Sequence, residues 1–341
     1  MNTIQFTSKS KNLRLNFGES YEVKANSCYR DNPEEILLEI VKEIKLGKYW
    51  KDSVKAFFAN NNPWLNEIIL SPKRINFINE FINPNGQTIL DIGAGLGQFS
   101  IPLAKGNAVC SLEPTSERLA FIKAVAEQEN VESKIFFIGA DYLNINFETK
   151  FDLILSIGVL EWVGMFNKQD SPVESVQLEF LKKISSDLSK DGKLVVGIEN
   201  RLGLKYLFGS NDDHTGLPNI SCLTKDLAKE KYKQATGKDL RCLTHSLHEY
   251  RELLIKAGFT KIDFYTALPD YKLPSKIFKI TNNNNSCAVN DFFSDGGYCE
   301  EHDGSNGETL NNQNELFSHY KSLAKLGIAH NFVPSFYIVA S

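Results

Sequence analysis

The amino-acid sequence predicts an α/β fold in which a doubly wound, parallel β-sheet carries helices on both faces. Three observations support this prediction. Apolar runs and segments of helical spacing alternate between residues 88 and 198, which is the pattern of parallel strands joined by helices. A glycine-rich turn follows the first apolar run. Acidic residues stand at the expected ends of three successive strands, and ligands of such sheets bind at that edge.

Seven strands are expected in this sheet. Five belong to the alternating part of the chain: Thr88–Ile92, Ala108–Leu112, Lys134–Ile138, Phe151–Ile157 and Lys193–Ile198. The segments Arg118–Glu129 and Val173–Ser189 have the apolar spacing of helices. The regular alternation ends after Ile198, and the last two strands are expected at Phe259–Tyr265 and Ser335–Ala340.

The segment before the sheet predicts a mainly helical N-terminal cap over residues 1–85. Residues 1–30 are polar with scattered aromatic residues and predict no element of their own. Asn32-Pro33-Glu34-Glu35 has the proline and the acidic residues typical of a helix start. Further helices are expected at Trp50–Ala59 and Pro72–Phe81. Residues 86–341 then form the main domain, with insertions at about 201–247 and 267–330, the second of them irregular.

Composition indicates an ordinary globular protein of 341 residues, 42% hydrophobic and 23% charged. The net charge of −4 does not favour a nucleic-acid partner, which requires a basic surface. The six cysteines are scattered and form no C-x-x-C pair, as expected of reduced thiols in a cytoplasmic protein. The N-terminus lacks an apolar leader, and no apolar run has the length of a membrane span.

The stretch Thr88–Phe99, TILDIGAGLGQF, predicts a nucleotide-binding turn. Glycine lets the backbone approach a ligand closely, and the N–H groups at a helix start point toward it. A dinucleotide fingerprint, G-x-G-x-x-G, would need a third glycine where Gln98 stands. An acidic residue, Asp91, precedes the turn instead. This arrangement favours a ligand with a positive charge over one with a pyrophosphate.

Two further acidic residues, Glu113 and Asp141, stand at the ends of predicted strands. Glu113 ends the second strand, 22 positions after Asp91, where an acid can accept hydrogen bonds from both hydroxyls of a ribose. Enzymes that use nicotinamide cofactors have an acidic residue at the same place. Glu113 therefore does not distinguish a dinucleotide ligand from the positively charged ligand that the turn favours. Asp141 follows the third strand, and a turn aspartate is the structural alternative there.

The pattern D-x-G-x-G-x-G at Asp91–Gly97 resembles motif I of class I S-adenosylmethionine-dependent methyltransferases. This resemblance covers residues 86–266 and 330–341 and implies a Rossmann-like sheet of seven strands whose last strand is antiparallel. It implies S-adenosyl-L-methionine as the cofactor. In this family the acid after the third strand contacts the adenine amino group, and the next residue packs against the ring. The implied donor contacts are Asp91, Gly93, Ala94, Gly95, Glu113, Asp141, Tyr142 and Ser156.

Other stretches bear on the methyl acceptor. Phe151–Val163 resembles a segment of small-molecule and sugar methyltransferases, although Trp162 replaces a common histidine. The chain lacks the [DN]-P-P-[YF] tetrapeptide of many nucleic-acid amino-methyltransferases at this point. IENRLGLKY (198–206), DHTG (213–216) and PDYKLP (269–274) resemble a bacterial group found with glycosyltransferases and surface-polysaccharide assembly. The resemblance implies O-methylation of a sugar, a glycan precursor or a phosphorylated sugar derivative, with glycosyltransferases of the same pathway as partners.

A hydroxyl acceptor must lose a proton, which calls for a base. His214 is the first candidate because imidazole titrates near neutral pH; a surface loop histidine is the alternative. His245 and Asp270 are the reserve candidates, and helix capping is the alternative role for His245. Glu161, Asn200 and Arg201 complete the predicted catalytic set. The predicted substrate-binding residues are Lys205, Asp213, Tyr271 and Lys272. The cations of Arg201, Lys205, Lys272 and Lys276 suit a phosphate or carboxylate, and solvated surface charges are the alternative.

No metal site is predicted. The acidic stretch Asp291–Asp303 lacks the register of a calcium-binding EF-hand and reads as a solvated loop. Two other functions stay open at this point. One is a nicotinamide-dependent sugar oxidoreductase, and the other is a non-catalytic scaffold that keeps the methyltransferase fold. The acceptor, the methylated atom and the oligomeric state are not determined by the sequence.

Overall fold

The computed structural model describes residues 3–23, 34–166, 170–281, 288–298, 302–303, 308–309 and 312–341. These residues fall into two compact units. Unit 1 comprises Met1–Val159 and Lys183–Val195, and unit 2 comprises Leu160–Lys182 and Val196–Ser341. This division differs from the boundary expected at residue 86. Strand β9 (Leu188–Glu199) and helix α7 (Val173–Asp187) contribute residues to both units.

The main sheet of unit 1 has parallel strands. Its order begins with β9 and continues β8 (Phe151–Ile157), β4 (Thr88–Ile92), β5 (Ala108–Leu112), β6 (Ile135–Gly139) and β3 (Ser20–Glu22). Strand β4 pairs in parallel with β5 and β8, and β6 pairs in parallel with β5 and β3. The central strands are buried along almost their whole length, as both faces of a parallel sheet must be.

A smaller sheet of three strands belongs to the same unit. Its order is β2 (Lys11–Asn16), β1 (Thr3–Ser8) and β7 (Ile145–Phe147), all antiparallel. Ile4, Phe6 and Ser8 on alternate positions of β1 are buried, which is the period of a strand covered on one face. Residues 3–22 thus form strands β1–β3, where the sequence predicted no element within a mainly helical cap.

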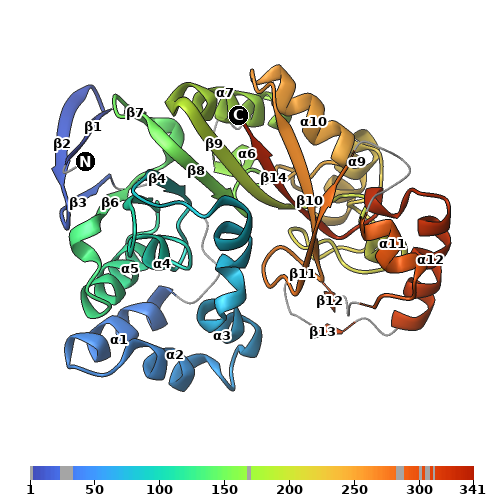
Figure 1. Cartoon of the computed structure of the whole chain (residues 1–341), viewed down its shortest axis with the longest axis horizontal. Helices are drawn as coiled ribbons and strands as arrows, with labels where there is room; N and C mark the ends of the chain where they lie inside the picture. Colours follow the sequence, from blue (N-terminus) through green and yellow to red (C-terminus); the bar gives the residue numbers. More distant parts are fainter. Residues whose placement is uncertain are drawn as a thin grey trace. The chain divides into compact units, whose positions relative to one another are not determined.

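Helices follow these strands in unit 1. Helix α1 packs against α5 (Figure 1), with Leu37, Ile40 and Ile44 buried along one side. The helix expected at Pro72–Phe81 is present in irregular form: η1 (Pro72–Ile75) is a 3-10 helix, residues 76–77 are α-helical, and η2 (Ile78–Ile82) is a π-helix. The predicted start at Pro33 lies outside the described residues. The other helices are α1 (Glu34–Lys45), α2 (Trp50–Phe58), α3 (Pro63–Leu70), α4 (Ser100–Leu103), α5 (Ser116–Gln128), η3 (Glu132–Lys134) and η4 (Tyr142–Asn144).

Unit 2 has an antiparallel set of strands. The order is β11 (Lys276–Ile280), β10 (Ile262–Leu268), β14 (Ser335–Ala340) and the end of β9. Both β11 and β14 pair antiparallel with β10, so the last strand of the chain has the direction that was expected. Strands lie at all seven predicted positions. The expected number of seven is nevertheless wrong, because there are two further edge strands: β3 beside β6, and β11 beside β10.

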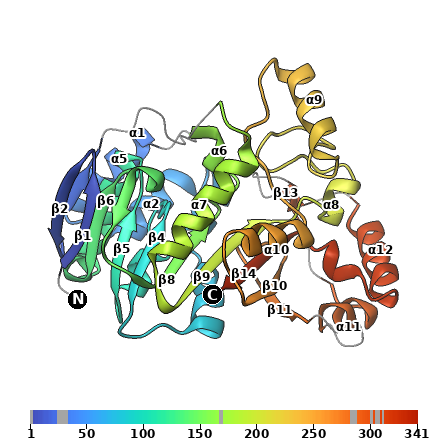
Figure 2. The ribbon, with the colours of Figure 1, turned by 90° about the horizontal axis from the view of Figure 1, so that it is seen from above.

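Short helices surround the strands of unit 2. Helix α10 lies over β10, and α11 packs against α12 (Figure 2). The insertion at 267–330 contains a helix, α12, as expected at about Gln313–Leu326, and is otherwise more regular than expected, because it also contains β11 and α11. No helix in the described ranges is both long and apolar enough to cross a bilayer. The remaining elements are α6 (Val163–Phe166), α8 (Leu204–Leu207), α9 (Lys225–Thr236), α10 (Leu247–Lys256), α11 (Ala288–Ser294), β12 (His302–Asp303), β13 (Glu308–Thr309), α12 (Gln313–Lys325) and η6 (Ala329–Asn331).

Candidate functional sites

The turn after β4 depends on glycine. Gly93, Gly95 and Gly97 have φ angles of 65°, 58° and 79°, in the left-handed region that side chains other than hydrogen disfavour. A Cβ atom on Gly93 would lie 2.6 Å from Cγ2 of Val159, so this position has no room for a side chain. The predicted close-approach turn is therefore present in unit 1.

Glu113 holds this turn from the next strand. Its Oε2 accepts a hydrogen bond of 2.9 Å from the N–H of Gly95, and its Oε1 accepts one of 2.9 Å from the N–H of Thr115. The residue is 3% exposed, and burial raises the pKa of its carboxyl. Both oxygens thus already bind backbone, and the expected contact with ribose hydroxyls stays a prediction.

Asp91 lies beside the same turn and is also buried. Its Oδ2 accepts a hydrogen bond of 2.6 Å from Oγ of Ser100. Burial raises the pKa of Asp91 to about 7, although the Ser100 hydrogen bond acts in the opposite direction. In the neighbouring strand, Ser156 is fully buried, and its Oγ has no hydrogen-bond partner among the described residues. A bound ligand could satisfy such a hydroxyl.

The side chains of Asp141 and Tyr142 make different kinds of contact. The Asp141 side chain caps η4 by accepting a hydrogen bond of 2.8 Å from the N–H of Leu143. Tyr142 is 3% exposed, and its hydroxyl donates a 2.7 Å hydrogen bond to Asp187. Lys183 Nζ lies 4.2 Å from the centre of the Tyr142 ring. The expectation that Tyr142 packs against an adenine ring is therefore corrected, because its own chain covers the ring.

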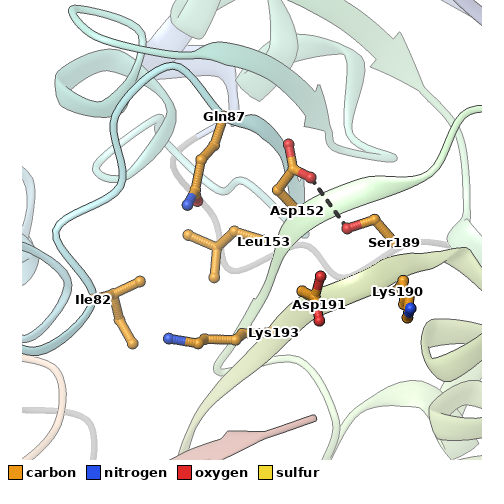
Figure 3. A pocket seen from close by; sticks show the side chains of 8 residues that line it. All are labelled: Ile82, Gln87, Asp152, Leu153, Ser189, Lys190, Asp191 and Lys193. Carbon is orange, nitrogen blue, oxygen red and sulfur yellow. Dashed lines mark hydrogen bonds between the residues drawn. The ribbon is translucent and has the colours of Figure 1, made fainter.

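A pocket of about 470 Å³ lies at the opposite edge of the unit 1 sheet (Figure 3). It adjoins the beginnings of β4 and β8, where Gln87 and Asp152 stand, whereas Asp91 and Glu113 lie at strand ends. Asp152 accepts hydrogen bonds from the N–H of Thr88 and from Ser189 Oγ. Since nucleotides bind at the carboxyl edge of such sheets, this pocket is not the expected cofactor site. Its lining is Ile82, Gln87, Asp152, Leu153, Ser189, Lys190, Asp191 and Lys193.

Unit 2 contains a buried group of ionisable side chains, which we call the polar cluster. Its members stand after β8, at the end of β9, in and after α8, and after β10. Most of these side chains are less than a tenth exposed. The polar cluster consists of Glu161, Glu199, Lys205, Asp213, His214, Asp270 and Lys272.

Both lysines of the polar cluster are paired with carboxylates. Lys205 Nζ donates a hydrogen bond of 2.9 Å to Asp213 Oδ2, which also accepts one from the hydroxyl of Tyr206. Lys272 Nζ donates to Glu199 Oε1 and lies 3.5 Å from Asp270 Oδ2. Burial alone would lower the lysine pKa values, but these carboxylates raise the pKa of Lys205 and Lys272. An anionic acceptor group would have to compete with them, so the predicted use of these lysines for a phosphate is not supported.

His214 lies between two other carboxylates. Its Nε2 is 3.7 Å from Glu161 Oε1 and 3.5 Å from Glu199 Oε2, and its side chain is 6% exposed. Burial lowers the pKa of His214, but the carboxylates of Glu199 and Glu161 raise it above the usual value. A protonated imidazole cannot accept a proton. The role of His214 as the base therefore stays a prediction that the raised pKa does not favour.

Three carboxylate oxygens of the polar cluster have no hydrogen-bond donor. Within the part of the chain that the structure describes, they are Glu161 Oε2, Glu199 Oε2 and Asp213 Oδ1, all buried. Burial raises the pKa of Glu161, against the effect of its contact with His214. Buried acceptors normally have partners. These oxygens can therefore accept hydrogen bonds from hydroxyl groups or bind a cation.

Asn200 and Arg201 have structural roles. Asn200 is fully buried, and its Nδ2 donates to the backbone oxygens of Asn331 and Val333 at 2.9 and 2.8 Å. Arg201 Nε donates a hydrogen bond of 2.7 Å to Glu249. Among the described residues, the structure shows no polar contact between either side chain and the polar cluster. The two residues are therefore withdrawn from the catalytic set. Backbone and helix-cap partners account for them.

His245 and Tyr271 also lie in unit 2. His245 Nε2 is 2.7 Å from Gln177 Oε1, and burial lowers the pKa of His245 to about 4. Ser246, and not His245, caps α10. Tyr271 is 2% exposed, and its ring centre lies 4.8 Å from Lys272 Nζ. Its contact with the acceptor stays a prediction.

Glu199 was not among the site residues predicted from the sequence. It is the last residue of β9, so the strand-end rule that selected Asp91 and Glu113 applies to it as well. The acidic stretch at 291–303 is only partly described: residues 299–301 lie outside the described ranges. Within those ranges, the groups with metal-ligand spacing are Glu161, Glu199 and His214, and Glu199, Asp213 and Asp270.

Residues 89–171 match a family model described as a methyltransferase domain. This segment contains the glycine turn, Glu113, Asp141, Ser156 and Glu161. This segment is therefore similar to a methyltransferase domain, and S-adenosylmethionine is the cofactor that the match supports. No curated protein matches the chain.

Three solved structures are similar to the chain at low identity. A cyclopropane synthase, MmaA2, from Mycobacterium tuberculosis is 18% identical, with 79% of this chain and 83% of that chain covered and a TM-score of 0.44. Phosphoethanolamine N-methyltransferase 2 from Haemonchus contortus, in complex with phosphomonomethylethanolamine and S-adenosylhomocysteine, is 14% identical, with 88% and 59% covered and a TM-score of 0.43. A SAM-dependent methyltransferase from Thermotoga maritima is 18% identical, with 67% and 92% covered and a TM-score of 0.39.

Proposed function

We propose that this protein transfers the methyl group of S-adenosylmethionine to a hydroxyl group of a small polar acceptor, with a sugar or glycan precursor as the first candidate. The observation that carries this proposal is the polar cluster, with three buried carboxylate oxygens that accept no hydrogen bond among the described residues. A sugar presents several hydroxyl donors, which such oxygens suit. The paired lysines favour a neutral sugar over a phosphorylated one.

The donor half of the proposal is assigned to unit 1. The glycine turn allows close approach of a ligand, and Asp91 and Glu113 lie buried beside it. The methyltransferase-domain match includes this whole region. We assign the sulfonium donor, with its charged amino acid tail, to these residues and retain Ala94, Asp141 and Ser156 as proposed contacts.

The acceptor half is assigned to the polar cluster of unit 2. The three stretches that resemble the bacterial polysaccharide-associated group supply all of its members except Glu161. Their meeting in one buried cluster supports a shared task, namely binding of the acceptor. On the same resemblance we propose a glycan pathway and its glycosyltransferases as partners. The free thiols Cys110, Cys222 and Cys242 are consistent with the reducing cytoplasm that was expected.

The chemistry is an in-line displacement. The acceptor oxygen attacks the methyl carbon, the carbon–sulfur bond breaks, and its electron pair stays on sulfur to give S-adenosylhomocysteine. The hydroxyl proton passes to a carboxylate of the polar cluster, and Glu161 is the first candidate because its Oε2 is buried and lacks a donor. Because the donor is already activated, positioning of the two reactants and removal of this proton are the protein's main tasks.

Replacement of the candidate base tests the proposal. Glu161→Gln keeps the shape of the side chain and removes the proton acceptor, so we expect turnover of a sugar acceptor to fall by about 10²- to 10⁴-fold. Affinity for S-adenosylmethionine, measured by calorimetric titration, should be unchanged. Glu252→Gln, on an exposed part of α10, is the matched control and should retain full turnover.

Each result has a clear meaning. Unchanged turnover in Glu161→Gln excludes Glu161 as the base. Binding of NADH instead of S-adenosylmethionine to the wild-type protein contradicts the methyltransferase proposal and favours an oxidoreductase. Binding of neither cofactor favours a non-catalytic scaffold.

A further inference from the structure

We propose that Glu161, Glu199 and His214 form a binding site for one divalent transition-metal ion. One ligand atom from each residue can be chosen so that all three lie within 4.8 Å of one another. His214 Nε2 is 3.7 Å from Glu161 Oε1 and 3.5 Å from Glu199 Oε2. Ligand atoms bound to a tetrahedral ion at about 2.1 Å lie roughly 3.4 Å from one another. The spacing therefore needs only a small contraction to accept the ion.

A second observation points to a ligand at the same place. Glu199 and Glu161 are each 1% exposed, and their Oε2 atoms accept no hydrogen bond from the described residues. Glu199 Oε2 is the atom that faces His214 Nε2. A buried carboxylate oxygen without a donor is costly. In the metal-free protein the protonated His214 is the cation between the two carboxylates. A metal ion bound there would replace the imidazole proton and could also give Glu161 Oε2 a partner.

The neighbouring charges leave this site available. Lys272 binds the other oxygen of Glu199, Oε1, and Lys205 is bound to Asp213. The second acidic group, formed by Glu199, Asp213 and Asp270, is different. The ammonium of Lys272 contacts all three of its carboxylates and already serves as the cation there. The metal is therefore assigned to the group that contains His214.

The donor set narrows the class of metal. One imidazole and two carboxylates suit Zn²⁺, Mn²⁺ and Fe²⁺ better than Ca²⁺, which prefers oxygen ligands alone. Three protein ligands leave at least one coordination position for water or an acceptor oxygen. That second role, binding of the acceptor hydroxyl, rests on the proposed function, whereas metal binding itself does not.

Metal titration of the full-length protein tests the site. The protein is stripped with a chelator and titrated with Co²⁺, whose visible spectrum reports inner-sphere ligands, and with Mn²⁺, whose free fraction is measured by electron paramagnetic resonance. We expect one ion per chain. Glu161→Gln and Glu199→Gln should each weaken binding at least ten-fold, and circular dichroism checks that both fold. Glu161→Gln is decisive if Glu199→Gln unfolds, because Glu161 has no lysine partner to release.

Two variants serve as controls for position. Glu252→Gln, exposed on α10, and Asp270→Asn, which belongs to the lysine-filled group, should both bind Co²⁺ as the wild type does. Absence of stoichiometric binding to the wild type, or equal binding to Glu161→Gln, overturns the proposal. Loss of Co²⁺ binding in Asp270→Asn, with binding retained in Glu161→Gln and Glu199→Gln, also overturns the proposal. Donor titration is carried out separately without metal, so failure of the metal site and failure of the proposed methyl transfer give different results.

Discussion

His214 shows how far a residue's chemistry depends on neighbours that are distant in the chain. The sequence shows Asp213 beside it, yet Asp213 is bound to Lys205. The carboxylates that face the imidazole come from Glu161 and Glu199, which stand 53 and 15 positions earlier. They keep the histidine charged in the metal-free protein. His214, the candidate base in the sequence, is thus a buried cation in the metal-free protein. In the proposed metal-bound protein it is a metal ligand.

Removal of this cation should destabilise the protein. In metal-free buffer at pH 7, His214→Gln leaves the buried Glu161 without a cation and Glu199 with Lys272 alone. The loss of one partner from a buried charge pair costs about 3–5 kcal/mol. Urea unfolding measures this difference. His248→Gln, at a side chain that is 79% exposed, should change the free energy of unfolding by less than about 0.5 kcal/mol. Similar values for the two variants would contradict the burial argument.

The residues of the candidate sites could be predicted where strand ends determine them. Asp91 and Glu113 were found in this way, and the same rule applies to Glu199. The roles of Asn200, Arg201 and Tyr142 could not be predicted, because their partners lie far away in sequence: Asn331, Glu249 and Asp187. A single sequence shows the residue types but not these pairings.

At the scale of elements, strands were predicted best where an apolar run has clear limits. β4, β5, β8 and β14 begin and end at the predicted residues. The hairpin of β1 and β2 was missed for a physical reason. Its two turn residues, Lys9 and Ser10, have φ angles of 47° and 61°, a conformation usually marked by asparagine and glycine. The residues Lys9 and Ser10 therefore do not indicate a turn in the sequence.

Helix α10 is held at its start by a network that can be tested. Ser246 and Glu249 form a capping box, and Arg201 binds Glu249. Burial raises the pKa of Glu249, but hydrogen bonds from Arg201 and Ser246 lower it by more, to about 2 from 4.5. The folded-state pKa lies below the unfolded one, so this stabilisation is present above pH 4.5 and is lost as the pH falls toward 2.

Glu249→Gln should therefore lower the free energy of unfolding at pH 7 by about 1–3 kcal/mol, as expected for a hydrogen-bonded charge. The variant should also lose less stability than the wild type between pH 5 and pH 3, as followed by urea unfolding at each pH. Donor binding should be unaffected. A parallel decline of both proteins with pH would show that Glu249 is not the group involved.

At the scale of the whole molecule, two ligands are assigned to two units: a nucleotide donor to unit 1 and a metal to unit 2. Variants of one unit should therefore affect one ligand. Gly93→Ala places a Cβ atom 2.6 Å from Val159 and should weaken S-adenosylhomocysteine binding at least ten-fold while leaving Co²⁺ binding intact. Calorimetry and the visible spectrum measure the two affinities.

Gly86→Ala is the matched control. Gly86 has a φ of 67°, close to the 65° of Gly93, but a Cβ atom there would meet nothing within 4 Å. Both variants carry a similar backbone penalty of about 1–2 kcal/mol, and only Gly93→Ala should lose the donor. Equal donor affinities in the two variants would refute the role of the turn.

The small sheet of unit 1 has a consequence for the order in which the protein is made. Phe6 in β1 pairs with Phe147 in β7. At a synthesis rate of about 5–20 residues per second, Phe6 leaves the ribosome roughly 7 to 28 s before Phe147. During that interval β1 can pair with β2 but not with β7. Ile4 and Phe6, which are buried in the finished protein, therefore lack part of the structure that covers them, and holding chaperones are expected to bind this segment of the nascent chain until Phe147 is made.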